Sequence, residues 1–522
     1  MSLQEPSDRE RHMYYCGLPS GPKLIARSST TPWPHPHQWP ENKKLDVATG
    51  HAIQQPWNDP RGTLQQLIIG TLSDIDWTAI DILRVGYESA YEDADRAPEC
   101  PVTMLISVSE NSTSFHQAET AIVECKQILA RLALDDVEVE VKESIVCTAA
   151  SNQGPATYSP TSGPQALRLT CGPFNNDVDD VKFQFGHHVS EYIGTSIGVR
   201  GPKKGTKSLY LQGNDNKTYA LTCRHVLFTD SDFIEYRSGD DNDKTTKQVI
   251  QPAEGTLVDT VTSFFSEKSG IETGIHLTSL PRYNTPAFQV QRLNSLQKRS
   301  LLESCQPRIE QLQDYGSFTL GRVEFSPPIQ VYSDRVRDWS LVELSQESFT
   351  TRLGDLTNKV PVTQQLRDAF DKYSGTVSQG TLLPVAASLE ATIGPHIIPE
   401  AELENTAASG LIVIKYGCKS GLTFGLSNGI RSVVRRPAGP GPAGAMVSNE
   451  WCIIGVNSQI PFSKGGDSGA CVFDLTGRIG GIMTAGLKKE NNPDGVDVTY
   501  ATPMQWLLDD IKRQGYDVKL PN

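Results

Sequence analysis

Short apolar segments separated by glycine, asparagine and proline turns follow one another from about residue 181 onward. Segments this short suit strands of about five residues better than long helices. The 43 glycines and 33 prolines of the 522-residue chain agree with that interpretation. We therefore predict a mainly β fold for residues 181–522, interrupted by two polar, helix-prone insertions at 282–314 and 351–405.

The first 180 residues have a different composition, and a chain of this length is expected to form two or three domains. Residues 1–62 are rich in proline, histidine and tryptophan and predict a tail without a core of its own. Residues 63–150 predict a small α/β domain, and 151–180 a linker. No catalytic grouping is found in residues 63–150, so we expect a regulatory or docking role for that domain. A regulatory partner is expected to bind there.

Local patterns place elements within the predicted α/β domain. The apolar run at 64–72 predicts a strand, followed by a helical stretch from Ser73. Ser114 and Gln117 form a capping-box pair ahead of a long apolar stripe, so a helix is predicted to begin there. The apolar run at 101–108 predicts a further strand.

The net charge and the N-terminal sequence disfavour several function classes. A net charge of −13 disfavours nucleic acid and anionic membranes as partners. No apolar run approaches the length of a membrane span, and the polar N-terminus does not resemble a signal peptide. With ten scattered cysteines, these features predict an intracellular protein, cytoplasmic or nuclear. His35 and His37 have no further ligands nearby, so no metal or cofactor is expected.

One serine lies in a setting that suits catalysis. The stretch SKGGDSGACVFD (463–474) places Ser468 between glycines and ahead of an apolar strand. A nucleophilic serine needs N–H donors for the oxyanion that it forms, and glycines allow the backbone to turn its amides toward one point. A Gly-rich turn without chemistry remains the alternative at this stage.

The remaining parts of a serine site are a base and a group that orients it. His225 follows an apolar strand in YALTCRHVLF (219–228), and Asp338 precedes one in DWSLVEL (338–344). A carboxylate in an apolar setting can hold an imidazole in one tautomer. Asp259 and Asp334 are rival candidates, but neither is followed directly by an apolar strand.

The motifs LTCRHV, DWSLVEL and GGDSGA occur in the order that the chymotrypsin-like (trypsin-like) serine peptidase family uses, and residues 181–510 resemble that family. The segment VIKYGCKSGLTFGLSNG (413–429) is similar to a hairpin of its bacterial and fungal members. The resemblance implies two six-stranded antiparallel β-barrels with the site between them. It also implies a polypeptide substrate.

The same resemblance assigns roles to individual residues. Ser468 is expected to be the nucleophile, His225 the general base and Asp338 the orienting carboxylate, with the N–H groups of Gly466 and Ser468 forming the oxyanion hole. The expected substrate pocket has Phe462 at its base and the strand IMTAG (482–486) as a wall, which includes Thr484 and Gly486. An apolar or modest-sized side chain is expected to fit it.

Two departures from the family bear on the compartment and on regulation. Val226 and Lys464 stand where secreted members carry disulfide cysteines, and no activation-cleavage site with an IVGG-type start is found. The sequence leaves a second function open: a catalytically silent regulatory or binding protein on a trypsin-like fold.

Overall fold

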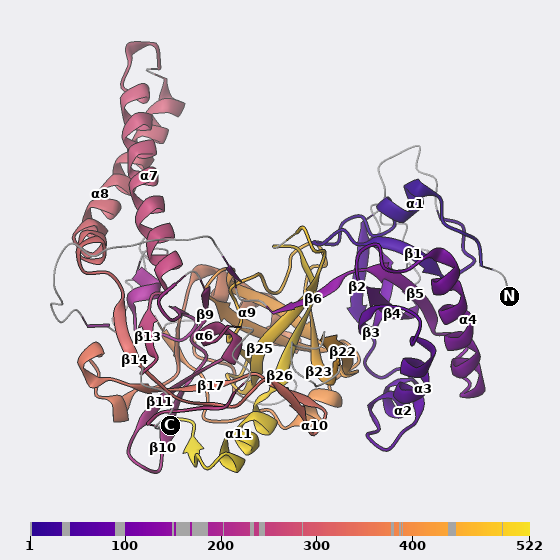
Figure 1. Ribbon diagram of the computed structural model, residues 1–522. Helices are drawn as coiled ribbons and strands as arrows, with labels where there is room; N and C mark the ends of the chain where they lie inside the picture. Colours follow the sequence, from indigo (N-terminus) through magenta and orange to yellow (C-terminus); the bar gives the residue numbers. More distant parts are fainter. Residues whose placement is uncertain are drawn as a thin grey trace.

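The structure, a computed structural model, is mainly β, with helices attached around two large sheets (Figure 1). This confirms the predicted class. The structure describes residues 3–33, 42–88, 100–148, 151–152, 168–169, 186–201, 203–229, 234–239, 246–283, 285–376, 381–385, 388, 390–436, 445–492 and 494–522.

Six strands of the C-terminal half close into a barrel. Antiparallel pairing runs from β23 through β21, β20, β24 and β25 to β26, and β26 pairs back onto β23. Apolar side chains such as Val413, Ile453 and Met483 fill part of its core. The six strands are β20 (Leu411–Gly417), β21 (Gly421–Ser427), β23 (Met446–Gly455), β24 (Cys471–Asp474), β25 (Ile479–Lys488) and β26 (Val496–Pro503).

The second sheet is a half-barrel of strands in the order β12-β14-β17-β11-β10-β27, with β13 also paired to β14. A single bridge between Gly198 and Ile250 links it to the short strands β8 and β9. Of the two predicted six-stranded barrels, the structure shows one as a closed barrel and the other as a half-barrel. The strands are β8 (Ser196–Ile197), β9 (Lys203–Thr206), β10 (Tyr210–Gly213), β11 (Thr218–Thr222), β12 (Tyr236–Arg237), β13 (Gln248–Gln251), β14 (Phe318–Ser326), β17 (Ser340–Leu344) and β27 (Val518–Lys519).

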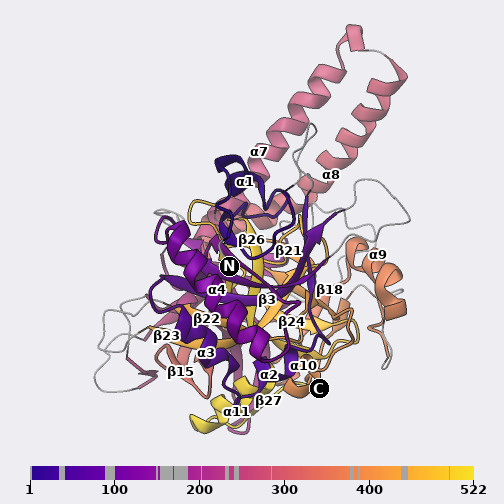
Figure 2. The same cartoon turned by 90° about the vertical axis from the view of Figure 1, so that its right-hand side faces the viewer.

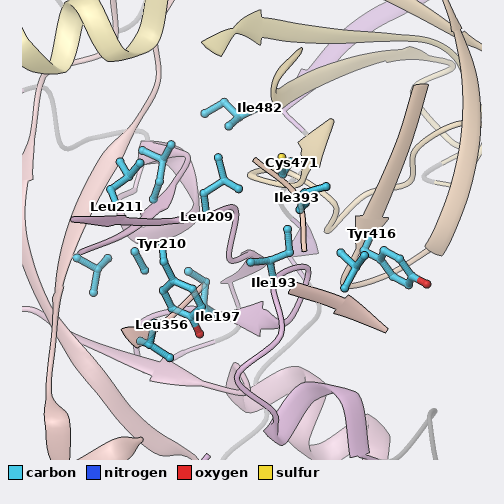
Figure 3. Packing of buried hydrophobic residues seen from close by; sticks show 14 of the residues in the cluster. Ile193, Ile197, Leu209, Tyr210, Leu211, Leu356, Ile393, Tyr416, Cys471 and Ile482 are labelled. Atoms are coloured by element: carbon cyan, nitrogen blue, oxygen red, sulfur yellow. The ribbon is translucent and has the colours of Figure 1, made fainter. Parts of the chain in front are cut away.

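One apolar core joins the two sheets (Figure 3). Leu209 and Leu211 enter it from the half-barrel, while Cys471 and Ile482 enter it from the closed barrel, and all four are buried. Burying both sheets in a single cluster removes apolar surface from water and fixes how the sheets face each other. α11 (Met504–Arg513) follows β26 and adds Leu507 to the same core.

The strands of the N-terminal region join the same sheet as those of the closed barrel. Its strands pair in the order β1-β5-β4-β3, and β2 also pairs with β3. On its other side β3 pairs with β22, which in turn pairs with β23 of the closed barrel. The side chains of Ile82 and Leu83 lie on opposite faces of β3 and pack into two different apolar clusters. The strands are β1 (Lys23–Arg27), β2 (Lys43–Val47), β3 (Trp77–Tyr87), β4 (Val102–Val108), β5 (Glu138–Glu143) and β22 (Ser432–Arg436).

Several N-terminal predictions need correction. The predicted tail 1–62 contains β1 and β2 as well as α1 (Asp8–Met13) and α2 (Gln54–Asn58); its residues 34–41 lie outside the described part. The predicted strand 64–72 is α3 (Leu64–Thr71), because Leu64 and Ile68, one helical turn apart, share its buried face. The helical stretch predicted from Ser73 is instead largely β3. The capping box is confirmed at the start of α4 (Phe115–Arg131).

A helical hairpin projects from the half-barrel (Figure 1). It consists of α7 (Glu254–Thr278) and α8 (Pro286–Tyr315), inserted between β13 and β14. The predicted insertion at 282–314 therefore covers α8 but omits α7. The sequence of α7 mixes β-branched residues with glycines and carries only a weak apolar stripe, so its helical period was not evident.

The second predicted insertion, 351–405, contains a two-stranded ribbon and two short helices, the described parts of which pack on the core through Val360 and Phe370. Its elements are β18 (Lys359–Pro361), α9 (Gln364–Tyr373), β19 (Glu390–Thr392) and α10 (Glu400–Glu404). A further ribbon precedes Asp338 and is formed by β15 (Gln330–Tyr332) and β16 (Arg335–Arg337). Figure 2 shows α9 beside the barrel, on the opposite side from α4.

The chain leaves the N-terminal sheet through two short strands, one of which pairs with β25 of the closed barrel and the other with β9. β6 (Ile145–Thr148) pairs antiparallel with β25, and β7 (Ser151–Asn152) pairs antiparallel with β9. Figure 1 shows β6 running from the N-terminal region onto the barrel. The predicted linker 151–180 therefore begins with a paired strand, and most of its remainder lies outside the described residues.

Among the described residues, no helix has both the length and the apolar character needed to cross a bilayer. None of the described cysteines forms a disulfide.

Candidate active site

His225 and Asp338 meet at the edge of the half-barrel. β11 ends at Thr222, and α6 (Arg224–Leu227) carries His225 directly after it. Thr222 pairs with Ser340 at the start of β17, which brings Asp338 alongside. The His225 Nδ1 atom lies 2.6 Å from Asp338 Oδ2, and the His225 backbone N–H donates to Asp338 Oδ1 at 3.1 Å.

Burial alone would raise the pKa of Asp338, but the adjacent His225 and the charge of Arg436 outweigh it and lower that pKa to about 2. The Arg436 Nη1 atom lies 3.7 Å from Asp338 Oδ2. An ionised carboxylate only accepts hydrogen bonds, so Nδ1 of His225 carries a proton, and in the neutral form of the ring Nε2 has the free lone pair. This Nε2 atom is buried and has no hydrogen-bond partner among the described residues.

The Ser468 loop lies where the two sheets meet. The Ser468 carbonyl accepts from the N–H of Thr206 on β9 at 2.7 Å, and Ser468 Oγ donates to the carbonyl of Thr484 on β25 at 3.4 Å. Gly469, at φ +90°, packs directly against the half-barrel. A Cβ atom there would lie 2.3 Å from the Thr206 carbonyl and 3.4 Å from the backbone nitrogen of Cys223, two residues before His225.

The backbone amides of Gly466 and Ser468 have the freedom that an oxyanion site needs. Gly466 adopts φ +113°, a conformation that favours glycine, and its carbonyl accepts from Thr206 Oγ1 at 3.2 Å. In the described part of the chain, neither the Gly466 N–H nor the Ser468 N–H donates to a protein acceptor. These two backbone N–H groups of the Ser468 loop therefore have no acceptor among the described residues.

A buried ion pair braces this loop, and sequence reasoning missed it. Asp467 accepts from Lys415 Nζ at 3.0 Å, and both side chains are wholly buried. It also accepts the N–H groups of Lys419, Ser420 and Lys464 at 2.9–3.0 Å. Burial opposes ionisation of Asp467, but these partners lower its pKa below the ordinary value. A lysine inside the apolar strand LIVIKYG was the available signal.

The three pocket residues occupy different surroundings. Phe462 is buried in the barrel core, and the Lys415 ammonium lies 5.4 Å from its ring centre. Thr484 Oγ1 donates to the Tyr500 carbonyl at 3.4 Å. A Cβ atom on Gly486 would lie 2.7 Å from Val496 Cγ1, so little space remains on that side of β25. The pocket itself remains a prediction.

Cys223 completes a compact group with the histidine and the aspartate, since their potential ligand atoms lie within 4.8 Å of one another. Burial and the charge of Asp338 raise the pKa of the Cys223 thiol well above its ordinary value. The thiol donates to the Met483 carbonyl at 3.3 Å. With the thiol bonded to the Met483 carbonyl and the imidazole bonded to Asp338, each of the three side chains already has a protein partner.

No protein-family model matches the chain, and no curated protein matches it. Among solved structures, the chain is similar to a Nocardiopsis protease, at 12% sequence identity and a TM-score of 0.29. That match covers 63% of this chain and 98% of the other. The fold described above rests on its own strand pairings and not on this neighbour.

Proposed function

We propose that the protein is a serine endopeptidase in which Ser468 attacks the peptide carbonyl, His225 takes and returns the proton, and Asp338 orients the imidazole. The Gly466 and Ser468 amides would bind the oxyanion. The half-barrel would serve as the first of two barrels, extended through the Gly198–Ile250 bridge to β8 and β9. The proposed substrate is a polypeptide, and the proposed chemistry uses no cofactor.

One observation carries this proposal: a buried imidazole whose Nδ1 is fixed by an ionised carboxylate while its Nε2 has no partner among the described residues. A histidine that served only to stabilise the fold would be expected to pair both nitrogens. His225 lies two residues after Cys223, whose backbone nitrogen would be 3.4 Å from a Cβ atom on Gly469, the residue that follows Ser468. That is where a general base for Ser468 is required.

The proposed reaction requires a small rearrangement. Ser468 Oγ now donates to the Thr484 carbonyl at the long distance of 3.4 Å, so this hydrogen bond is weak. Rotation about χ1 moves Oγ between staggered positions without moving the backbone. Catalytic hydrogen bonds often tighten only when substrate is bound, and the same is expected for Ser468 and His225.

The proposal is tested with a small ester and a protein substrate. With p-nitrophenyl acetate, wild type should release a burst of one nitrophenol per chain. In a separate assay, it should hydrolyse denatured casein. Ser468→Ala should lose both activities, and Thr476→Ala, which changes a hydroxyl in the turn after β24, should keep both. A burst that survives in Ser468→Ala would overturn the assignment of the nucleophile. Absence of both activities in wild type would favour the silent binding protein.

A further inference from the structure

The strand β22 ends on a buried arginine that reaches the candidate site. Arg436 is the last residue of β22, and its side chain is buried. Its Nη1 atom lies 3.7 Å from Oδ2 of Asp338, the same carboxylate oxygen that lies 2.6 Å from Nδ1 of His225. A cation from the sheet of the closed barrel and an imidazole from the half-barrel therefore share one oxygen.

Strand pairing and a docked ribbon hold the arginine and the carboxylate in place. β22 pairs with β3 of the N-terminal region on one edge and with β23 on the other. Arg335 of β16 donates from Nη1 to the Asn449 carbonyl of β23 at 2.8 Å, and the Asn449 N–H donates to the Asp334 carbonyl at 2.7 Å. The ribbon that leads into Asp338 is thereby joined to β23, the neighbour of the strand that carries Arg436.

The hydrogen bonding of Arg436 suits an electrostatic role better than a structural one. Its Nε and Nη2 atoms are buried and have no hydrogen-bond partner among the described residues, where Asp338 is the carboxylate that pairs with it. An arginine that served to stabilise the fold would be expected to pair most of its N–H groups. A buried ion pair is also weak evidence of stabilisation, because desolvation offsets the attraction. The charge of Arg436 is thus left to act on Asp338 and, through it, on His225.

We propose that Arg436 is a positioning residue of the candidate site, whose charge keeps Asp338 ionised and keeps His225 a free base in mildly acidic solution. The inference rests on the proposed function and adds a residue to its machinery. A cation favours the charged form of a nearby carboxylate and disfavours the charged form of a nearby imidazole. Both effects preserve the state that catalysis needs, a negative Asp338 beside a neutral His225, as the pH falls.

The other titratable groups around the carboxylate and the imidazole come from three places in the fold. Cys223, directly before α6, lies within 4.8 Å of both, but its thiol pKa is raised, so the thiol stays neutral. Glu450 of β23 is buried, and burial raises its pKa, which favours its neutral form. Arg335 of β16 is paired with Glu400 of α10, which offsets its charge. Among the described groups, Arg436 is therefore the cation that acts on the site without a second carboxylate to oppose it.

The test measures kcat/KM for p-nitrophenyl acetate from about pH 4 to about pH 8 in wild type and in Arg436→Gln. The acid limb of this profile reports protonation of the free base. Without the cation, the limb should move to higher pH by about one unit. The rate on the limb then falls about tenfold, while the plateau stays within about threefold of wild type. A structural role would instead lower the rate at every pH and leave the limb in place.

Matched variants separate charge from folding. Arg435→Gln removes the same charge from the adjacent residue, which pairs with Asp76 at 3.1 Å, and should leave the limb in place. Arg436→Lys keeps the charge and should restore the limb to within about 0.3 unit of wild type. Arg436→Met is a second uncharged variant, of similar length and suited to a buried site, and should shift the limb as Arg436→Gln does. An unmoved limb in the uncharged variants, or an equal shift in Arg435→Gln or Arg436→Lys, would overturn the proposal.

A second measurement does not depend on catalysis. NMR of the protein labelled with ¹³C-histidine follows the titration of His225, whose signal is identified by its loss in His225→Gln. The midpoint should rise by about one unit in Arg436→Gln. If the midpoint rises but wild type hydrolyses no ester, the peptidase proposal is overturned and the electrostatic role of Arg436 stands. If wild type hydrolyses the ester but the midpoint stays the same, the role of Arg436 is overturned and the peptidase proposal stands.

Discussion

Two buried aspartates, one in each half of the candidate site, are hydrogen-bonded in opposite ways. Asp467 in the closed barrel is surrounded by donors: the Lys415 ammonium, the Ser420 hydroxyl and three backbone N–H groups. Asp338 at the half-barrel binds Nδ1 of His225, and Nε2 of the same ring has no partner among the described residues. A saturated carboxylate holds a loop in place, whereas a chain of contacts that ends in a free nitrogen can move a proton.

The comparison predicts that replacing Asp338 abolishes catalysis and leaves the fold in place. Asp338→Asn keeps the size of the side chain but can donate to Nδ1, which favours the wrong tautomer of His225. The rate of ester or peptide hydrolysis should fall by about 10⁴-fold, as such a change does in other enzymes with this triad. Steady-state kinetics measure the loss, and circular dichroism checks the fold. A variant within tenfold of wild type would mean that Asp338 does not orient the base.

Replacing Lys415 should chiefly cost stability. Lys415→Met leaves Asp467 buried without its cation, and breaking a buried pair in this way costs about 3–5 kcal/mol. Urea unfolding followed by tryptophan fluorescence measures the change. The double variant Lys415→Met/Asp467→Asn removes both charges and should recover part of the loss. A single variant as stable as wild type would contradict the bracing role.

Acid should weaken the contribution of Asp338 in a defined range. Its folded-state pKa of about 2 lies below the ordinary 3.8, so its stabilising effect is complete above that ordinary value and is lost as the pH falls toward 2. The effect amounts to about 2 kcal/mol. The difference in unfolding free energy between wild type and Asp338→Asn should shrink as the pH falls below ~4. A difference that grows on acidification would contradict this sign.

Motif order selected the residues of the candidate site from the sequence, and their catalytic roles stay a prediction. His225 and Asp338 were each recognised at the end or start of an apolar strand, and the structure pairs them. The GGDSG stretch selected Ser468 because glycine spacing reports a local backbone requirement, and Gly466 and Gly469 do adopt positive φ angles. The α4 helix followed from its capping box for the same local reason.

Features that depend on distant parts of the chain were missed. The apolar run at 64–72 is compatible with a strand or a helix by its composition, and packing of Ile68 against the N-terminal sheet selects the helix. Pairing of β6 with β25 joins residues more than three hundred positions apart, and no local signal encodes it. Lys415, the partner of Asp467, likewise lies on a distant element, the strand β20.

The central claim is that Ser468 is a nucleophile activated by His225, and mapping of a covalent adduct tests it most directly. The folded protein is treated with a fluorophosphonate, digested and analysed by mass spectrometry, with His225→Gln and Ser468→Ala in parallel. The account predicts a single adduct on Ser468 in wild type, a greatly slowed adduct in His225→Gln and none in Ser468→Ala. An unmodified Ser468 in folded wild type, or equal labelling in His225→Gln, would contradict it.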